Sequence, residues 1–145
     1  MPSLAVAASL LALATVAMST QPKKPTAKRE PDPCAHWQGT SSGNDPSVKL
    51  TAILCPAGDG RITGTLVWES ARSGTNTRTV DGTQSGRSLT LRDLTLEGNP
   101  KPGWRFCKID RYALALVGDG DTSLEGTYHS SACNDDATVK LTRIR

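Results

Sequence analysis

Apolar and polar residues alternate along most of the chain after Cys34, and this pattern predicts β-strands. In a strand every second side chain lies on the same face, so the alternation indicates a sheet with one buried face. No segment shows the spacing of an amphipathic helix. We therefore expect eight hairpin-linked strands over residues 36–41, 47–55, 61–69, 76–84, 87–96, 105–117, 122–130 and 137–144.

A four-residue phrase (apolar residue, any residue, glycine, threonine) occurs four times, starting at Trp37, Ile62, Val80 and Leu124. Each copy puts an apolar residue and a glycine on one strand face, and glycine inside a strand typically marks a bend or a close backbone approach. Four bends on one face favour a curved or closed sheet. The glycines are expected on the inner face, with Gly39 opposite Leu50, Gly64 opposite Ala52, Gly82 opposite Leu89 and Gly126 opposite Leu114.

Four cysteines predict two disulfides, and strand register ranks the three pairings. If Cys34 faces Cys55 in an antiparallel hairpin, the apolar residues of both strands share one face. The same holds if Cys107 faces Cys133. We therefore predict the disulfides Cys34–Cys55 and Cys107–Cys133.

The same requirement, that the apolar residues of paired strands share one face, predicts the register of other hairpins. Leu54 is expected opposite Ile62, and Ser85-Gly86 is expected to form a two-residue turn. The alternation of apolar and polar residues shifts by one position near Asp93, which indicates a bulge. The proline-containing stretch Glu97–Gly103 is interpreted as a longer connection.

An even number of hairpin-linked strands lets the last strand pair with the first, so we predict an all-β, eight-stranded antiparallel up-and-down β-barrel. With a tryptophan on its first strand and Arg143 near the end of its last, the domain resembles the lipocalin and avidin group of small barrels. In lipocalins such an arginine covers the first-strand tryptophan, which the resemblance implies for Arg143 and Trp37. The chain departs from the lipocalin pattern at Ala35, in place of a glycine, and lacks a C-terminal helix. The resemblance concerns the fold, and a fold does not define a function.

The first 33 residues differ in composition from the rest. Leu4–Met18 is almost wholly apolar, as in a signal-peptide core, although no basic residue precedes Lys23. Small residues at the −3 and −1 positions predict cleavage before Thr20, with an uncleaved anchor as the alternative. We expect a signal peptide at 1–19, a disordered Pro/Lys-rich tether at 20–33 and the barrel domain at 34–145. This organisation predicts a secreted or periplasmic protein with no stable membrane span after cleavage.

The formal net charge of +3 does not indicate a nucleic-acid partner. From Cys34 onward the chain has 13 basic and 12 acidic residues, so the domain is nearly neutral. A nucleic-acid-binding surface needs a basic stripe with interleaved aromatic residues, and the sequence has none.

The polar residues do not form a recognised catalytic or metal motif. His36 and His129 fall on the outward face, and the chain has no G-x-S-x-G element, so we expect no enzyme activity. The acidic turn that begins at Asp119 has Leu124 and Ser130 where an EF-hand requires glycine and glutamate, so we expect no metal site and no cofactor.

The remaining candidate is the barrel interior. Apolar pockets with a few polar groups are typical small-molecule sites, and an eight-stranded barrel is either filled or holds one small ligand. The candidate ligand-binding residues are Trp37, Leu66, Trp68, Tyr112, Leu114, Tyr128 and Arg143, which are alternatively plain core residues. The sequence therefore favours an exported, non-catalytic module that binds a small apolar or amphipathic molecule.

A protein partner is the alternative. Such a module, for example an inhibitor of an extracellular enzyme, would use the Glu97–Gly103 loop with Trp104 and the Arg72-Ser73-Gly74 turn.

Overall fold

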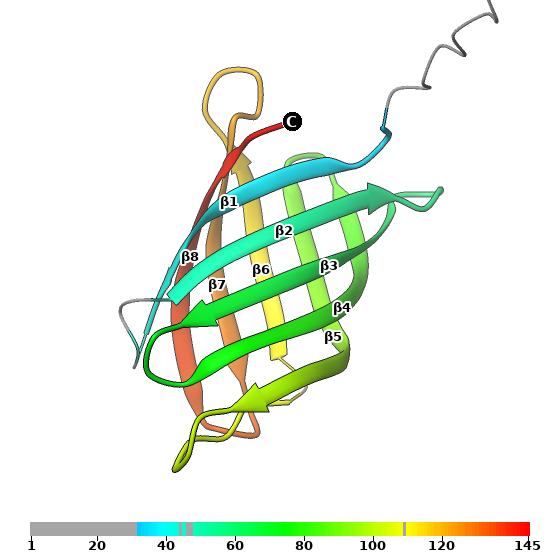
Figure 1. The fold of residues 1–145 in the computed structure, drawn as a ribbon. Coiled ribbons are helices and arrows are strands. Elements are labelled where there is room, and N and C mark those ends of the chain that lie inside the picture. Colours follow the sequence, from blue (N-terminus) through cyan, green and yellow to red (C-terminus); the bar gives the residue numbers. More distant parts are fainter. Residues whose placement is uncertain (1–31, 44, 46–47, 109) are drawn as a thin grey trace, which may run out of the picture. The chain divides into compact units, whose positions relative to one another are not determined.

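The computed structural model describes residues 32–43, 45, 48–108 and 110–145, which form a closed antiparallel barrel (Figure 1). The strands are β1 (Ala35–Ser42), β2 (Val48–Pro56), β3 (Arg61–Ser70), β4 (Gly74–Ser85), β5 (Ser88–Pro100), β6 (Asp110–Val117), β7 (Ser123–Ser130) and β8 (Asp135–Arg143). Each strand pairs with the next, and β8 pairs with β1. The predicted eight-stranded up-and-down barrel is confirmed, and at this coarse level it is consistent with a lipocalin-like fold.

The predicted signal peptide, and the tether up to residue 31, lie outside the described residues. So do residues 44, 46 and 47, between the first two strands. Within the described part of the chain, no helix has the length and apolar character needed to cross a bilayer.

Both predicted disulfides are confirmed. Cys34, directly before β1, is bonded to Cys55 of β2. Cys107, in the β5–β6 connection, is bonded to Cys133 in the β7–β8 turn. The β1–β2 and β6–β7 registers have the predicted pairings. Two disulfides suggest an oxidising environment, outside the cell or in a periplasm.

The predicted β2–β3 register is wrong by two residues, because Pro56 rather than Leu54 lies opposite Ile62. The reason is a tight turn, in which Gly58, Asp59 and Gly60 all have positive φ (83°, 52° and 71°). A shift of two residues leaves every side chain on its predicted face, since the period of a strand is two.

The predicted β4–β5 turn is also displaced. Ser85 pairs with Ser88, so the turn residues are Gly86 and Arg87, with Gly86 at a φ of 58°. Glycine with positive φ is favoured at the first position of such a two-residue turn. The predicted bulge near Asp93 is confirmed, because the pairing with β4 shifts there and leaves Leu94 as the extra residue.

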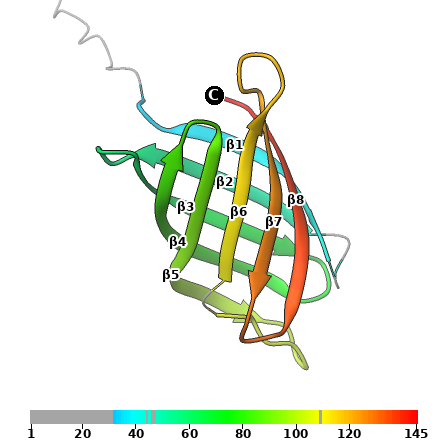
Figure 2. The ribbon, with the colours of Figure 1, turned by 180° about the vertical axis from the view of Figure 1, so that it is seen from behind.

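The predicted connection Glu97–Gly103 is wrong in its first half. β5 continues to Pro100 while paired with β4, and β6 begins only at Asp110. Five residues of β5, Ser88–Arg92, pair with β6. Beyond them β5 bends and its second half runs along β4, away from β6 (Figures 1 and 2). A β-bulge bends its strand, so the extra residue at Leu94 accounts for this change of direction.

The four repeated glycines lie where strands approach closely. Gly39 and Gly126 have their predicted partners. Gly64 lies opposite Leu54 and Gly82 lies opposite Leu91, because the β2–β3 and β4–β5 registers differ from the predicted ones by two residues. A Cβ on Gly82 would lie 1.8 Å from a backbone oxygen of β5, and on Gly39 it would lie 2.0 Å from one of β8. The glycines therefore permit the strong curvature of the sheet, as the sequence indicates.

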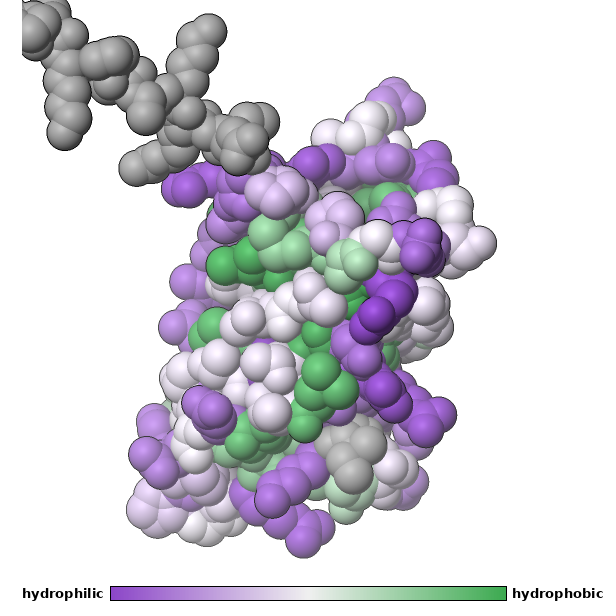
Figure 3. Space-filling view, turned by 90° about the vertical axis from the view of Figure 1, so that its right-hand side faces the viewer, coloured by the Kyte–Doolittle hydropathy of each residue, from purple (hydrophilic) through white to green (hydrophobic). Residues whose placement is uncertain are grey.

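The inner face is packed with apolar side chains from every strand, from Trp37 on β1 to Leu141 on β8. The outer surface is mixed: the face in Figure 3 has hydrophilic residues along its margins and scattered apolar residues between them. The exposed large apolar residues among those described are Ile53, Leu94, Trp104 and Ile144.

Candidate ligand-binding site

The barrel has a pocket at each end and a packed core between them. The Trp68 pocket has a volume of about 170 Å³ and is lined by residues that include Trp68, Arg78, Trp104, Phe106, Tyr128 and Asp135. The Trp37 pocket has a volume of about 250 Å³ and is lined by residues that include Trp37, Leu54, Ile62, Leu89, Leu116 and Arg143.

The candidate residues from the sequence are divided between these places. Trp68 and Tyr128 border the Trp68 pocket, Trp37 and Arg143 border the Trp37 pocket, and Leu66, Tyr112 and Leu114 are buried residues that border neither. The structure therefore does not bring the seven residues together around one central cavity.

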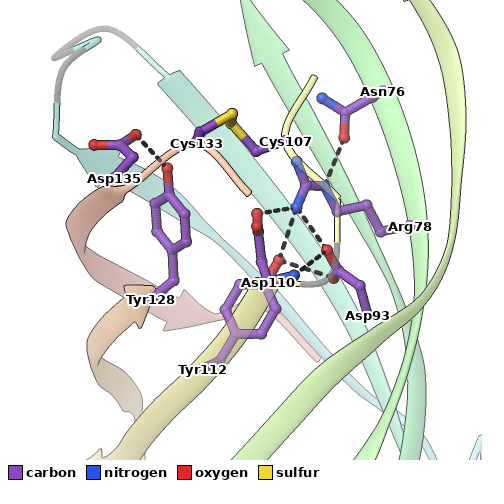
Figure 4. A network of polar contacts seen from close by, with 9 residues as sticks. All are labelled: Asn76, Arg78, Asp93, Cys107, Asp110, Tyr112, Tyr128, Cys133 and Asp135. Atoms are coloured by element: carbon purple, nitrogen blue, oxygen red, sulfur yellow. Dashed lines mark hydrogen bonds and ion pairs between the residues drawn. A yellow bond between two sulfur atoms is a disulfide. The ribbon is translucent and has the colours of Figure 1, made fainter. Parts of the chain in front are cut away.

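The floor of the Trp68 pocket has a buried arginine that the sequence analysis did not select. Arg78 of β4 is 5% exposed, and its Nη1 donates to Asp93 Oδ2 at 2.7 Å and to Asp110 Oδ2. Tyr112 donates its hydroxyl to Asp93 Oδ1 at 3.1 Å, and Arg78 Nε donates to Asn76 Oδ1 at 2.8 Å (Figure 4). These five residues form one polar network inside the barrel.

The network contains two carboxyl groups for one guanidinium. Burial raises the pKa of Asp93, and the neighbouring Asp110 adds to this effect while Arg78 opposes it. Taking charges out of water is costly unless they are paired and hydrogen-bonded, and Arg78 supplies that pairing to both acids. The positive charge of Arg78 is therefore balanced before any ligand enters the pocket.

Aromatic rings form one wall of the Trp68 pocket. The Trp68 and Tyr128 rings meet edge to face with centroids 5.0 Å apart, and the Arg78 guanidinium lies 5.1 Å from the Trp68 centroid. Tyr128 donates its hydroxyl to Asp135 Oδ2 at 2.8 Å. Burial and this hydrogen bond both raise the pKa of the Tyr128 hydroxyl.

The connection from β5 to β6 forms the rim of the Trp68 pocket and is fastened at several points. Lys101 donates from its backbone nitrogen to the Ser73 carbonyl at 2.9 Å and from Nζ to the Ala71 carbonyl at 2.6 Å. The Arg72 guanidinium lies 5.2 Å from the centroid of the Trp104 ring. Cys107, which also lines the pocket, is tied by its disulfide to the β7–β8 turn.

The Trp37 pocket has the pair of residues that the resemblance to lipocalins implied. Trp37 lies opposite Arg143 in the β1–β8 ladder, and the guanidinium is 5.8 Å from the ring centroid. Arg143 is exposed and donates from Nε to the Arg145 carbonyl at 3.2 Å. The arginine therefore covers the tryptophan from the solvent side.

Strand parity was the signal that could have revealed the buried network. The interpretation that put Val80 on the inner face also puts Arg78 there, two positions earlier on the same strand. The same parity places Asp93 with Leu91 on β5 and Asp110 with Tyr112 on β6. These charged residues were not predicted because only apolar residues of these strands were assigned to the interior.

Within the described ranges, each of the two histidines has an acidic hydrogen-bond partner and neither is hydrogen-bonded to a serine, threonine or cysteine side chain. His36 Nε2 lies 2.9 Å from Asp32 Oδ2, and His129 Nδ1 lies 2.7 Å from Asp136 Oδ1. Ser130 is fully buried, whereas the adjacent His129 is exposed on the other face of β7. Among the described residues, no group of three or more His, Cys, Asp or Glu side chains is placed to hold a metal ion.

Comparisons with protein-family models, curated proteins and solved structures found no match for the chain.

Proposed function

We propose that this protein is a non-catalytic binding module whose Trp68 pocket accommodates a small amphipathic molecule. The observation that carries the proposal is the combination of aromatic walls and a polar floor in one preformed concavity. Ligand sites are typically mostly apolar with a few fixed polar groups. Since a cavity of about 150 Å³ holds benzene, a pocket of about 170 Å³ fits a molecule with one ring.

The position of the site also supports this proposal. Trp68 and Tyr128 stand on strands of a closed barrel, and the rim is held by a disulfide and by the contacts of Lys101. A pocket fixed in advance loses less entropy when it binds a ligand than a flexible one does. The disulfides further support a secreted or periplasmic location, where the ligand would be captured.

The three indole N–H groups allow a direct test by nuclear magnetic resonance, because Trp68 and Trp104 border the pocket and Trp37 lies at the other end. A mixture of one-ring aromatic fragments should shift the Trp68 and Trp104 indole signals and leave that of Trp37 in place. A screen in which no fragment moves these two signals would contradict the proposal.

A matched pair of variants localises the effect. Ser73→Phe puts a ring at the rim of the Trp68 pocket, whereas Gln84→Phe puts the same ring at the Trp37 pocket. Fragment binding should be lost in the first variant and retained in the second.

A protein partner at the same rim is the second candidate. Trp104 is 43% exposed and is held by Arg72, so the loop and turn that the sequence singled out lie side by side. Tryptophan and arginine are enriched among the residues that dominate binding energy at interfaces. If a partner binds here, Trp104→Ala should weaken it about 30-fold or more, whereas an unchanged affinity would exclude this surface.

A further inference from the structure

The floor of the Trp68 pocket has hydrogen-bond donors that the protein itself does not use. Toward the described residues, Arg78 donates hydrogen bonds through Nε and Nη1, to Asn76, Asp93, Asp110 and Tyr112. Its remaining nitrogen, Nη2, donates to no described residue. It is also not one of the buried polar atoms without a partner, so it is accessible from outside the packed interior. Because Arg78 lines the Trp68 pocket, Nη2 presents its two N–H groups there.

A second unused donor belongs to a neighbouring side chain. Trp68 Nε1 is buried and has no hydrogen-bond partner among the described residues. Trp68 and Arg78 both line the pocket, and the Arg78 guanidinium lies 5.1 Å from the centroid of the Trp68 ring, so the two side chains that carry these donors are neighbours. A buried polar group without a partner is unfavourable, so an acceptor that reaches it is stabilised.

The charge around the pocket disfavours an anion. Asp93 and Asp110 already balance Arg78, and the other charged residues that line the pocket are Asp45, Asp135 and Arg105. Counted with the two buried partners of Arg78, the charged residues that line the pocket are four acids and two bases, so a carboxylate or phosphate ligand would meet more acidic than basic groups there. A neutral acceptor gains the same hydrogen bonds without that repulsion.

We infer that the Trp68 pocket selects neutral, ring-sized molecules that present a carbonyl-type oxygen to Arg78 Nη2 and Trp68 Nε1. This inference rests on the proposed function, because it names the ligand class of the same pocket. The aromatic wall of Trp68, Tyr128 and Phe106 contacts the ring of the ligand, and the two donors orient its oxygen.

Three probes of similar size and shape test this selection on the purified full chain. Acetophenone has a neutral carbonyl oxygen, α-methylstyrene has a methylene group in its place, and benzoate is an anion. Titrations followed by the Trp68 indole signal should show acetophenone binding about tenfold or more tightly than either of the others, the effect of one to two hydrogen bonds. Equal or tighter binding of benzoate or of α-methylstyrene would overturn the inference while leaving a ligand pocket in place.

A conservative variant tests the role of the indole donor. Trp68→Phe keeps an aromatic ring and removes the N–H, so its titrations are followed by the indole signal of Trp104, which lines the same pocket. The advantage of acetophenone over α-methylstyrene should fall about threefold to tenfold in this variant. Trp37→Phe makes the same change at the other pocket and should leave the advantage intact. An advantage unchanged in Trp68→Phe would remove this indole from the proposed site. If aromatic fragments bind but none of the three probes does, the carbonyl inference fails alone; if no fragment binds, the proposed function fails as well.

Discussion

A tryptophan with an arginine over its ring stands at each end of the barrel, but the two arginines have opposite surroundings. Arg143 is exposed at the end of β8, and its contact with Trp37 leaves its charge in water. Arg78 is 5% exposed and is paired with two buried aspartates. The same pair of residue types therefore acts as a solvent-side cover at one end and as part of an internal polar network at the other.

Burial changes how much an arginine contributes to the stability of the fold. An exposed arginine gives up little solvation and gains little from its neighbours. A buried arginine is tied to its acids, because removing it leaves charges with neither water nor a partner. The Trp68 end has therefore fixed polar groups, which a specific binding site requires.

The largest expected difference between the two ends is in stability. Arg78→Met leaves Asp93 and Asp110 buried without their cation and should lower the free energy of unfolding by about 3–5 kcal/mol. Arg143→Met, the matched change at the exposed end, should cost less than about 1 kcal/mol. Urea unfolding of both variants measures the difference, and equal losses would show that the two arginines are not in different environments.

The two disulfides should be alike in stability and different in their effect on binding. Their sequence separations are 21 and 26 residues, so removing either should cost about 3 kcal/mol in the chain-entropy model. Only the Cys107–Cys133 bond holds the rim of the Trp68 pocket. Serine replacements of each pair, compared by thermal unfolding and fragment binding, should weaken binding only for this bond. A binding loss confined to the Cys34–Cys55 variant would contradict the assignment of the site.

The buried carboxyl group of Asp93 should give the Trp68 end a pH dependence. The pKa of Asp93 is raised in the folded protein above its usual value of 3.8, so the folded state holds this proton more tightly than the unfolded state. The resulting stabilisation is fully present below about pH 4 and is lost as the pH rises through the folded-state pKa. Stability relative to an Asp93→Asn variant should therefore decrease from pH 4 upward. Parallel curves for the two proteins would contradict a raised pKa.

The smallest effect concerns the two tyrosines of the chain, both near the Trp68 end. Burial raises the pKa of Tyr112 well above 10, and burial together with the hydrogen bond to Asp135 raises that of Tyr128. Ultraviolet titration should show neither tyrosine ionising near pH 10 in the folded protein, whereas both should titrate with a midpoint near pH 10 in denaturant. The contribution of these hydroxyls to stability is complete below pH 10 and is lost as the pH rises through their folded-state pKa values. Asp135→Asn should lower the pKa of Tyr128 without moving that of Tyr112.

The sequence predicted which face each residue occupies better than it predicted which residues meet. Alternation fixes the face of a side chain, and it is unchanged when one strand slides by two positions along its neighbour. The β2–β3 and β4–β5 registers were wrong for this reason, while the cysteines anchored the other two hairpins.

The candidate site was harder to predict than the fold. Parity places Arg78 inside, but its meeting with Asp93 and Asp110 depends on the bend of β5 at Leu94 and on where β6 begins. Neither feature has a periodic signal in the sequence. The division of the interior into two end pockets also depends on how large side chains fill the middle, which strand patterns do not describe.

The short ladder between β5 and β6 has a consequence for how the barrel comes apart. Five residue pairs join these strands, against twelve between β4 and β5, so this seam is the expected place for the first local opening. Opening there converts a closed barrel into a sheet with two free edges. Those backbone amides of Ser88–Arg92 that bond to β6, and not those that bond to β4, should exchange hydrogen early. At high concentration two opened copies have complementary edges, which is a low-cost route to a strand-exchanged dimer. Arg78 donates hydrogen bonds to Asp93 of β5 and to Asp110 of β6. It therefore links the two strands of this seam and stabilises the closed, monomeric barrel.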